Sequence, residues 1–465
     1  MVSEMEWTRY IQEDPRCPHL RNRPSSVVSI FRVPKFLKDT KREAYIPQRV
    51  SLGPYHHANA ELSSMNHYKA RALRRMMKRC NSNMDLANRA SDEILKVEIE
   101  IRHSYEESIG FHGKTLARML SLDGCFLLEV LRSLSGDDSP DPIFGNKQLN
   151  YAARDIVKDI LMVENQLPFI VLGRLLQLEL GLAATDADKM LLDVLVKAAS
   201  SLFAASSLFK HLNDWPEAYA RDVHHLLGFL HRIIVYPPRF DQSYRLDEGE
   251  YSISFKGYCT HCIKCCSSRI FMKLQAASIK LVANTVQRIR PAVELRNAGI
   301  KFKPRHGGIE DIEFDENSAT IFLPPIRITD ITEVLFRNLV AFEMCRSSEI
   351  NYVCSYLNLM NDLIDSQEDV ALLTSKGILI NRIGSNEDVA DLFYSLCKDA
   401  GTENMENVFA EVKKEVNAHY KNKFRVQFGE LLRDHFSSPW KALALVQGFY
   451  ALCLTLIQTI FTIYK

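Results

Sequence analysis

Apolar residues recur three and four positions apart along most of the chain, and this spacing predicts a mainly helical protein. We expect helices over residues 62–79, 94–109, 114–134, 151–182, 188–212, 216–235, 271–297, 332–365, 388–399, 405–419 and 428–435. Pro168 lies inside one of these patterns. It must kink or break the helix, because proline has no amide proton and its ring clashes with the preceding turn.

Two regions depart from the helical period. Residues 25–57 contain short apolar runs interrupted by proline and glycine, which favours an extended segment packed on the rest of the protein. Apolar and polar residues alternate over 300–302, 309–314 and 320–323, between turn-forming residues. This alternation predicts three short strands that form a small sheet around residues 300–325.

The end of the chain has a pattern of its own. Residues 442–464 are twenty-three positions without one charged side chain. A helix of that length spans about 34 Å, and the hydrocarbon core of a bilayer is about 30 Å thick. Aromatic rings and lysines suited to the lipid interface stand at both ends, at Trp440, Lys441, Tyr464 and Lys465. We expect a C-terminal transmembrane helix; the alternative is a buried core helix, because Gln447 and Gln458 lower the hydropathy.

These patterns divide the chain into three parts. Residues 1–27 form an N-terminal tail, residues 28–438 form a helical body, and residues 439–465 form a membrane anchor. Within the body, residues 236–269 carry little helical periodicity and are interpreted as a variable linker or insertion.

Composition and charge narrow the functional classes. The 465 residues include 46% hydrophobic and 25% charged side chains, as expected for a folded chain. The 58 basic and 57 acidic residues nearly cancel, which argues against a nucleic-acid partner. The eleven cysteines are scattered and odd in number, as in a reducing compartment. With no signal-peptide pattern in residues 1–30 and no Asn-x-Ser/Thr acceptor, we expect a cytosolic body.

Several separated motifs resemble those of a known plant family. They are IFRVP at 30–34, YIP at 45–47, VSLGPYHH at 50–57, DGCFLL at 123–128, VENQLPF at 163–169, ELRNAGIKF at 294–302 and RNLVAFE at 337–343. Together they resemble the domain-of-unknown-function 247 family, also called uncharacterised protein family 0481. The resemblance implies a land-plant protein with a helical body, a C-terminal membrane helix and no established catalytic chemistry. Some grass members of that family are associated with pollen–stigma self-incompatibility.

One cysteine cluster has the spacing of a metal knuckle. Cys259, Cys262, Cys265 and Cys266 could share one Zn²⁺, but no second knuckle or histidine pair accompanies them. Free thiols in an insertion and a lipidation site near a membrane are the alternatives. We therefore assign no metal site and no cofactor.

Two groups of polar residues are candidates for acid–base chemistry. His56 and His57, together with His67, could be a ligand set or a base. The pair follows a Gly-Pro turn with no carboxylate at a diagnostic spacing, which favours a structural turn. Asp123 lies in an apolar helix, and Glu164, with Asn165 and Gln166, precedes the break at Pro168. Buried polar groups there would satisfy backbone groups that the kink frees. We assign no catalytic residue; an unrecognised active site that uses Glu164, His56 or His57 is the alternative.

A basic helix is the last candidate surface. Residues 67–79 include six lysines and arginines, which could meet anionic lipid or an acidic partner. A solvated helix face is the favoured interpretation, and without a second basic element an RNA site is weaker still.

The leading hypothesis is an interaction or recognition protein, and an enzyme with an unrecognised site is the rival. We expect a cytosolic body held at a membrane by residues 442–464, with an unknown protein partner. A homodimer through the anchor is a further expectation, because small and polar residues share one helix face at Ala444, Gln447, Ala451, Thr455, Gln458 and Thr462. The alternatives are that this stripe packs on the body or that it only tolerates interfacial water. The sequence specifies no particular membrane.

Overall fold

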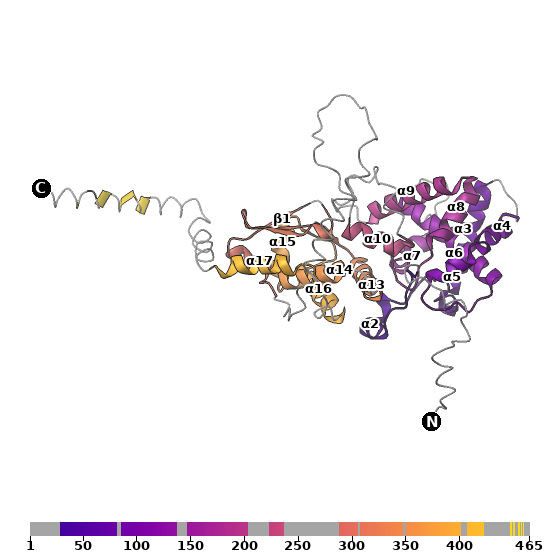
Figure 1. Ribbon diagram of the computed structural model, residues 1–465, viewed down its shortest axis with the longest axis horizontal. Helices are drawn as coiled ribbons and strands as arrows, with labels where there is room; N and C mark the ends of the chain where they lie inside the picture. The colour runs from indigo at the N-terminus through magenta and orange to yellow at the C-terminus, as the bar shows by residue number, and fades with distance from the viewer. Residues whose placement is uncertain are drawn as a thin grey trace, which may run out of the picture. The chain divides into compact units, whose positions relative to one another are not determined.

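The computed structural model describes residues 28–80, 85–136, 147–202, 223–236, 288–305, 307–346, 350–400 and 407–422, together with eight positions between 447 and 459. All of them except Arg288 belong to one compact unit. Helices dominate this unit, and a small mixed sheet accompanies them (Figure 1). The prediction of a mainly helical protein with a small sheet is confirmed.

The described elements fall into two stretches of the chain. The first contains α2 (Lys35–Thr40), η2 (Arg42–Ala44), η3 (Ala60–Met65), α3 (Asn66–Arg79), α4 (Asp85–Leu95), α5 (Glu98–Ser104), α6 (Gly113–Leu134), α7 (Lys147–Ile160), α8 (Phe169–Leu180), α9 (Ala184–Leu202) and α10 (Leu226–Val235). The second contains α12 (Ala292–Asn297), β1 (Lys301–Pro304), η8 (Ile309–Asp311), β2 (Glu313–Asp315), β3 (Thr320–Leu323), β4 (Ile326–Ile328), α13 (Thr332–Cys345), α14 (Tyr352–Leu363), α15 (Gln367–Ser375), β5 (Leu379–Asn381), α16 (Asn386–Ala400) and α17 (Ala410–Lys421).

Helix α6 is central to the first stretch. It contacts α3, α4, α8 and α9, and most of its side chains from Leu116 to Leu131 are buried. Gly124 allows α8 to approach, because a Cβ atom at this position would lie 2.5 Å from a methyl carbon of Leu175. The missing side chain therefore sets the spacing of two core helices.

The three predicted strands form one sheet with the order β1-β3-β2. Strand β1 is parallel to β3, and β2 is antiparallel to it. The buried face carries Phe302, Phe314 and Ile321, and α17 covers it at Phe314, whose ring lies 5.7 Å from that of His419. A second sheet, the parallel pair β4-β5, was not predicted, because three-residue strands are too short to show a period.

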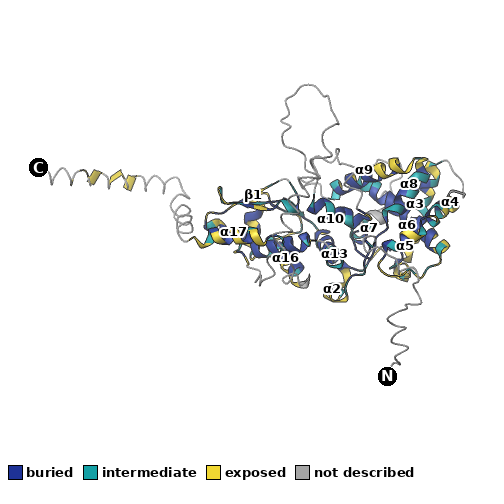
Figure 2. Ribbon diagram, viewed as in Figure 1, coloured by how far each residue is buried: buried dark blue, intermediate teal, exposed yellow. Residues whose placement is uncertain are grey.

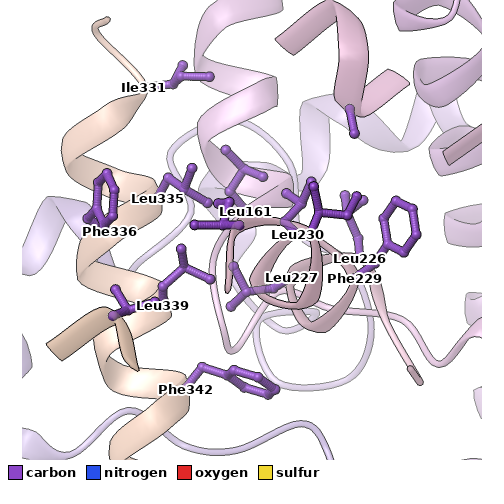
Figure 3. Packing of buried hydrophobic residues seen from close by; sticks show 14 of the residues in the cluster. Leu161, Leu226, Leu227, Phe229, Leu230, Ile331, Leu335, Phe336, Leu339 and Phe342 are labelled. Atoms are coloured by element: carbon purple, nitrogen blue, oxygen red, sulfur yellow. The ribbon is translucent and has the colours of Figure 1, made fainter. Parts of the chain in front are cut away.

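The two stretches share one hydrophobic core. Figure 3 shows Leu335 and Leu339 of α13 pointing toward Leu161, which follows α7, and toward Leu227 of α10. All four side chains are 2% exposed or less. Buried positions line the sides where the helices meet, and exposed positions lie on their outer sides (Figure 2). Burial of apolar surface on this scale is the main favourable contribution to folding.

Several predicted elements need correction. The single helix over 94–109 is wrong, because Val97 leaves the helical conformation between α4 and α5 and is buried there. The helix over 271–297 is wrong at 288–291, because the residue before Pro291 disfavours helical geometry. The helix over 332–365 is divided between α13 and α14.

Smaller differences affect the sheet and the helix ends. The strand over 309–314 begins as η8, because the Asp311 carboxylate accepts a hydrogen bond from the Gly308 N–H at 3.0 Å and holds a tight turn. Helix α15 was not predicted. The tail over 1–27, most of the linker over 236–269, the cysteine cluster and the helix over 428–435 lie outside the described residues.

Most of the predicted anchor also lies outside the described residues. Of residues 442–464, the eight described positions are helical and exposed. Within the described parts of the chain, no helix is both long enough and apolar enough to cross a membrane. The structure therefore does not support the predicted transmembrane helix. At the described positions it also contradicts the alternative of a helix buried in the core.

Truncating a core side chain of α13 should cost much of the stability. Leu339→Ala removes a fully buried side chain between α13 and α10, so the free energy of unfolding should fall by about 2 to 5 kcal/mol. Urea denaturation followed by circular dichroism measures this loss. Leu180→Ala is the matched control: Leu180 is 41% exposed on α8, and its loss should be about 1 kcal/mol or less. Equal losses in the two variants would contradict the packing in Figure 3.

Candidate functional site

The extended segment over residues 28–57 passes several buried polar side chains of the interior. Few of its backbone N–H and C=O groups bond to other backbone groups. The short helices α2 and η2 satisfy only some of them. Buried N–H groups must find acceptors, because an unpaired one costs as much as a lost hydrogen bond. Side chains from α6, from the end of α7 and from residues 161–168, the connector between α7 and α8, supply them.

Asp159, near the end of α7, accepts three consecutive backbone N–H groups. Its carboxylate oxygens lie 2.9 Å from Gln48 N, 2.7 Å from Arg49 N and 2.8 Å from Val50 N. Burial raises the pKa of Asp159 to about 6, and the three donors offset burial only in part. This carboxylate holds the backbone turn that leads into the VSLGPYHH motif.

Asp123, on the buried side of α6, also accepts a backbone N–H group of the extended segment. It accepts the Gly53 N–H at 2.9 Å and forms a buried ion pair with Lys69 of α3 at 2.6 Å. Lys69 also donates to the carbonyl of Ser51 at 2.6 Å. Helices α3 and α6 are thereby attached to the extended segment at Ser51 and Gly53.

The side-chain amides of Asn165 and Gln166 form hydrogen bonds with backbone groups. Asn165 bonds to the extended segment, and both residues bond to the end of α7 and the connector. Asn165 accepts the Leu52 N–H at 2.6 Å and donates to the carbonyls of Val50 and Asp159. Gln166 donates to the carbonyls of Ile160 and Met162 and accepts from Leu227 N. The predicted function of these amides, to satisfy backbone groups freed by the break before Pro168, is confirmed.

Glu164 is the most heavily engaged carboxylate of the connector. Its side chain is fully buried and accepts from Val33 N at 2.8 Å. Three basic side chains reach it: Lys38 Nζ at 2.6 Å, Arg32 Nη1 at 3.2 Å and His56 Nε2 at 3.2 Å. Burial alone would raise its pKa, but His56, Lys38 and the Val33 N–H outweigh burial and lower the pKa to about 2. Such a carboxylate is a poor proton acceptor at neutral pH.

The RNLVAFE motif links this site to α13. Asn338 accepts the Val163 N–H at 2.9 Å and donates to the carbonyl of Ala44 at 2.8 Å. One turn further along the helix, Glu343 lies 2.8 Å from His231 Nε2 and accepts the N–H groups of Val353 and Cys354 at the start of α14. The acidic and amide residues of this motif therefore join α13 to η2, to the connector after α7, to α10 and to α14.

The structure separates most of the histidines that the sequence places together. His56 meets Glu164, whereas His57 is exposed and packs edge-on against Phe111. His67 packs against the neighbouring Tyr68. No cluster of three or more His, Cys, Asp or Glu side chains within the described ranges could hold a metal ion. The pairing of His56 with Glu164 was missed, because its two members are far apart in the sequence.

The basic helix α3 is only partly a solvated face. Lys69 and Arg75 are buried, and Arg79 pairs with Glu129 and Glu179, each at 2.5 Å. The signal for Lys69 was its position in the apolar stripe of the helix, where a cation requires a buried partner. The remaining basic residues of α3 lie on its outer side.

The amino-acid sequence matches a plant family along almost its whole length. A family model, DUF247, described as a plant protein of unknown function, matches residues 30–454. The chain is 30% identical to the putative UPF0481 protein At3g02645 of Arabidopsis thaliana, over 93% of this chain and 89% of the relative. It is 27% identical to the Arabidopsis UPF0481 protein At3g47200, over 92% of this chain and 85% of the relative. No solved structure matches.

A methyl group at Gly53 should disrupt the site. Gly53 has a φ of +69°, and a Cβ atom there would lie 2.8 Å from the Tyr105 hydroxyl and 2.9 Å from the Gln166 carbonyl. Gly53→Ala should therefore lower the free energy of unfolding by about 1 to 3 kcal/mol or more, as measured by urea denaturation. Gly110→Ala is the control, because a Cβ atom there would have no neighbour within 4 Å. A Gly53→Ala variant as stable as the control would contradict this close approach.

Removing the Glu164 charge should cause a loss of stability that depends on pH. The folded-state pKa of about 2 lies below the unfolded value of 4.5, so the charge stabilises the folded protein above about pH 4.5 and loses this effect as pH falls toward 2. Glu164→Gln should cost about 3 kcal/mol at pH 7, and the difference from wild type should shrink below about pH 4.5. Urea denaturation at a series of pH values measures it.

The control for this series is Glu107→Gln. Glu107 contacts the same Arg32, but its side chain is 54% exposed, so its replacement should change stability by about 1 kcal/mol or less. A Glu164→Gln penalty that stays constant from pH 7 to pH 3 would exclude the charge as its cause.

Proposed function

The chain belongs to the DUF247 family of plant proteins of unknown function, and from this premise we propose that it is a membrane-tethered protein that recognises a protein partner through its surface. The body, held together by the site around Glu164, presents that surface. The C-terminal run over 442–464 is the tether.

The observation that carries the tether is the exposure of large apolar side chains near the end of the chain. Tyr450 is 67% exposed, Leu454 46% and Ile457 51%. They occupy helical positions in a run without charged residues. Apolar side chains in such a row are unfavourable in water, and a lipid environment would cover them.

The proposal of a non-enzymatic body rests on how the candidate polar residues are used. Asp123, Asp159 and Asn165 are engaged with backbone groups of the extended segment. Glu164 is surrounded by basic groups that lower its pKa to about 2. Side chains with these roles support the fold, so the surface is left to carry recognition.

One contact favours the alternative that the protein is an enzyme. His56 Nε2 lies 3.2 Å from Glu164, and the imidazole is 12% exposed, so a histidine and a carboxylate meet near the surface. In a catalytic pair the carboxylate would orient the imidazole as a general base. If the pair is catalytic, Glu164→Gln should lower an enzymatic activity and leave the free energy of unfolding unchanged. If Glu164 is structural, the same variant should lower the free energy of unfolding.

We propose that the body faces the cytosol, because its eleven scattered cysteines suit a reducing compartment and the chain has no Asn-x-Ser/Thr acceptor. Association of two anchors through residues 444–462 stays a prediction, as does a role in pollen–stigma recognition. Neither is needed for the tether.

Deleting residues 440–465 should release the protein from membranes. The deletion removes the exposed apolar positions and leaves the described body intact. In plant cells, the full chain should sediment with membranes and the truncated chain should remain in the supernatant. Proximity labelling with both forms should then identify neighbours that require the tether.

Deletion of residues 1–27 is the matched control, since it removes a segment of similar length from the other end and should leave sedimentation unchanged. Continued sedimentation of the protein without residues 440–465 would refute the tether. Protection of the body from protease in intact microsomes would refute the cytosolic orientation.

A further inference from the structure

Helix α17 is held on the body mainly by polar residues. Four of its twelve residues are buried, namely Lys413, Val416, Asn417 and His419, and only Val416 is apolar. Helix α14 also has twelve residues, but eleven of them are buried and most of these are apolar. Burial of apolar surface is the main favourable contribution to folding. Less free energy therefore holds α17 on the body than holds α14.

The central contact of α17 is a buried ion pair. Lys413 Nζ lies 2.6 Å from a carboxylate oxygen of Asp362 on α14, and both side chains are 5% exposed or less. Water must leave both charges before they can meet, and this cost offsets much of their attraction. Both charges regain water when α17 leaves. The pair therefore fixes the position of the helix but adds little to the free energy that keeps it bound.

Helix α17 is also joined to the residues around the start of α12. The Ile289 N–H donates to the same Asp362 carboxylate, at 3.4 Å. The hydroxyl of Tyr420 on α17 donates to Glu294 of α12 at 3.4 Å, and the Arg290 guanidinium lies 5.9 Å from the centre of the Tyr420 ring. Movement of α17 would thus remove contacts from both sides of the start of α12.

The position of α17 allows it to leave without disturbing the central core. Its inner side covers the sheet at Phe314, and its outer side is exposed at Glu411, Lys414, Glu415 and Ala418 (Figure 2). It is the last described helix before the C-terminal run (Figure 1). The apolar contacts between α10 and α13 do not involve it.

We propose that α17 is a releasable latch: it detaches as a unit while the rest of the body stays folded, and its release loosens the residues around the start of α12. Such local opening needs less free energy than global unfolding. One consequence rests on the proposed function. If the C-terminal run is a tether, release lengthens the connection, because twelve residues span about 18 Å as a helix and about 40 Å when extended.

Hydrogen exchange of the full-length protein in a mild detergent tests the latch. Helix α13 lies in the core, so its amides should exchange only when the whole body unfolds. After correction for intrinsic rates, mass spectrometry should find that the amides of wild-type α17 exchange roughly tenfold faster or more than those of α13.

Lys413→Met should open the latch. The substitution removes the ammonium group that compensates the buried Asp362 charge, which destabilises the closed form. Exchange in α17 and around the start of α12 should rise roughly tenfold or more, with exchange in α13 unchanged. Adding Asp362→Asn removes the second charge as well, so the double variant should exchange at close to the wild-type rate.

Lys414→Met is the matched control. Lys414 is the next residue of the same helix, but its side chain is 65% exposed and pairs with the exposed Glu411. An exposed pair of this kind contributes little to stability, so exchange in α17 should stay at the wild-type rate.

Three results would overturn the proposal. Wild-type α17 that exchanges as slowly as α13 would show that the helix does not open by itself. A uniform rise over the whole body in Lys413→Met would show that the ion pair supports the entire fold. A rise in α17 without one around the start of α12 would exclude their coupling. None of these results depends on the tether, which the sedimentation experiment tests separately.

Discussion

Hydrogen bonds from the backbone of residues 48–53 to buried acceptors are the constraint on which much of the described fold depends. Residues 50–53 are buried, and the whole run from 48 to 53 belongs to no helix and to no sheet. Its N–H groups are satisfied by Asp159, Asn165 and Asp123, which come from two other parts of the sequence. Burying a carboxylate is costly unless donors surround it, and burying an amide is costly unless an acceptor meets it. Each group therefore removes the penalty of the other.

The same contacts explain why the connector after α7 has its shape. Pro168 prevents one continuous helix through the connector, and the end of α7 at Ile160 leaves carbonyls there without intrahelical donors. Gln166 donates to two of these carbonyls, and Asn165 donates to a third. Since Asn165 also binds the extended segment, neither the connector nor the segment is satisfied without the other. Folding of this region must be cooperative, and it depends on contacts that are distant in the sequence.

The sequence predicted what is local and missed what is not. The long helices α3 and α6 and the strands β1 and β3 follow from periodicity within a single window. The break at Val97 is set by burial of that side chain against the rest of the core, and a local pattern cannot show it. The polar residues before Pro168 were predicted to satisfy the kink because the need arises within a few residues. Their second role, hydrogen bonding to the extended segment, can be recognised only from the tertiary fold. The same holds for His56 and Glu164, and for Lys69, whose position in an apolar stripe was the one sign of its buried partner.

The buried polar residues and the exposed ones differ in how freely they can be replaced. A carboxylate whose pKa is about 2 remains charged throughout the physiological range, and its basic neighbours are held in fixed positions by that charge. Changing such a residue alters the scaffold before it alters any contact with a partner. The outer face of the sheet has the opposite character: Lys303 and Glu313 are exposed, and their replacement has little to disturb inside the protein. Substitutions on that face therefore cost folding little, whereas the polar interior fixes the backbone that presents it.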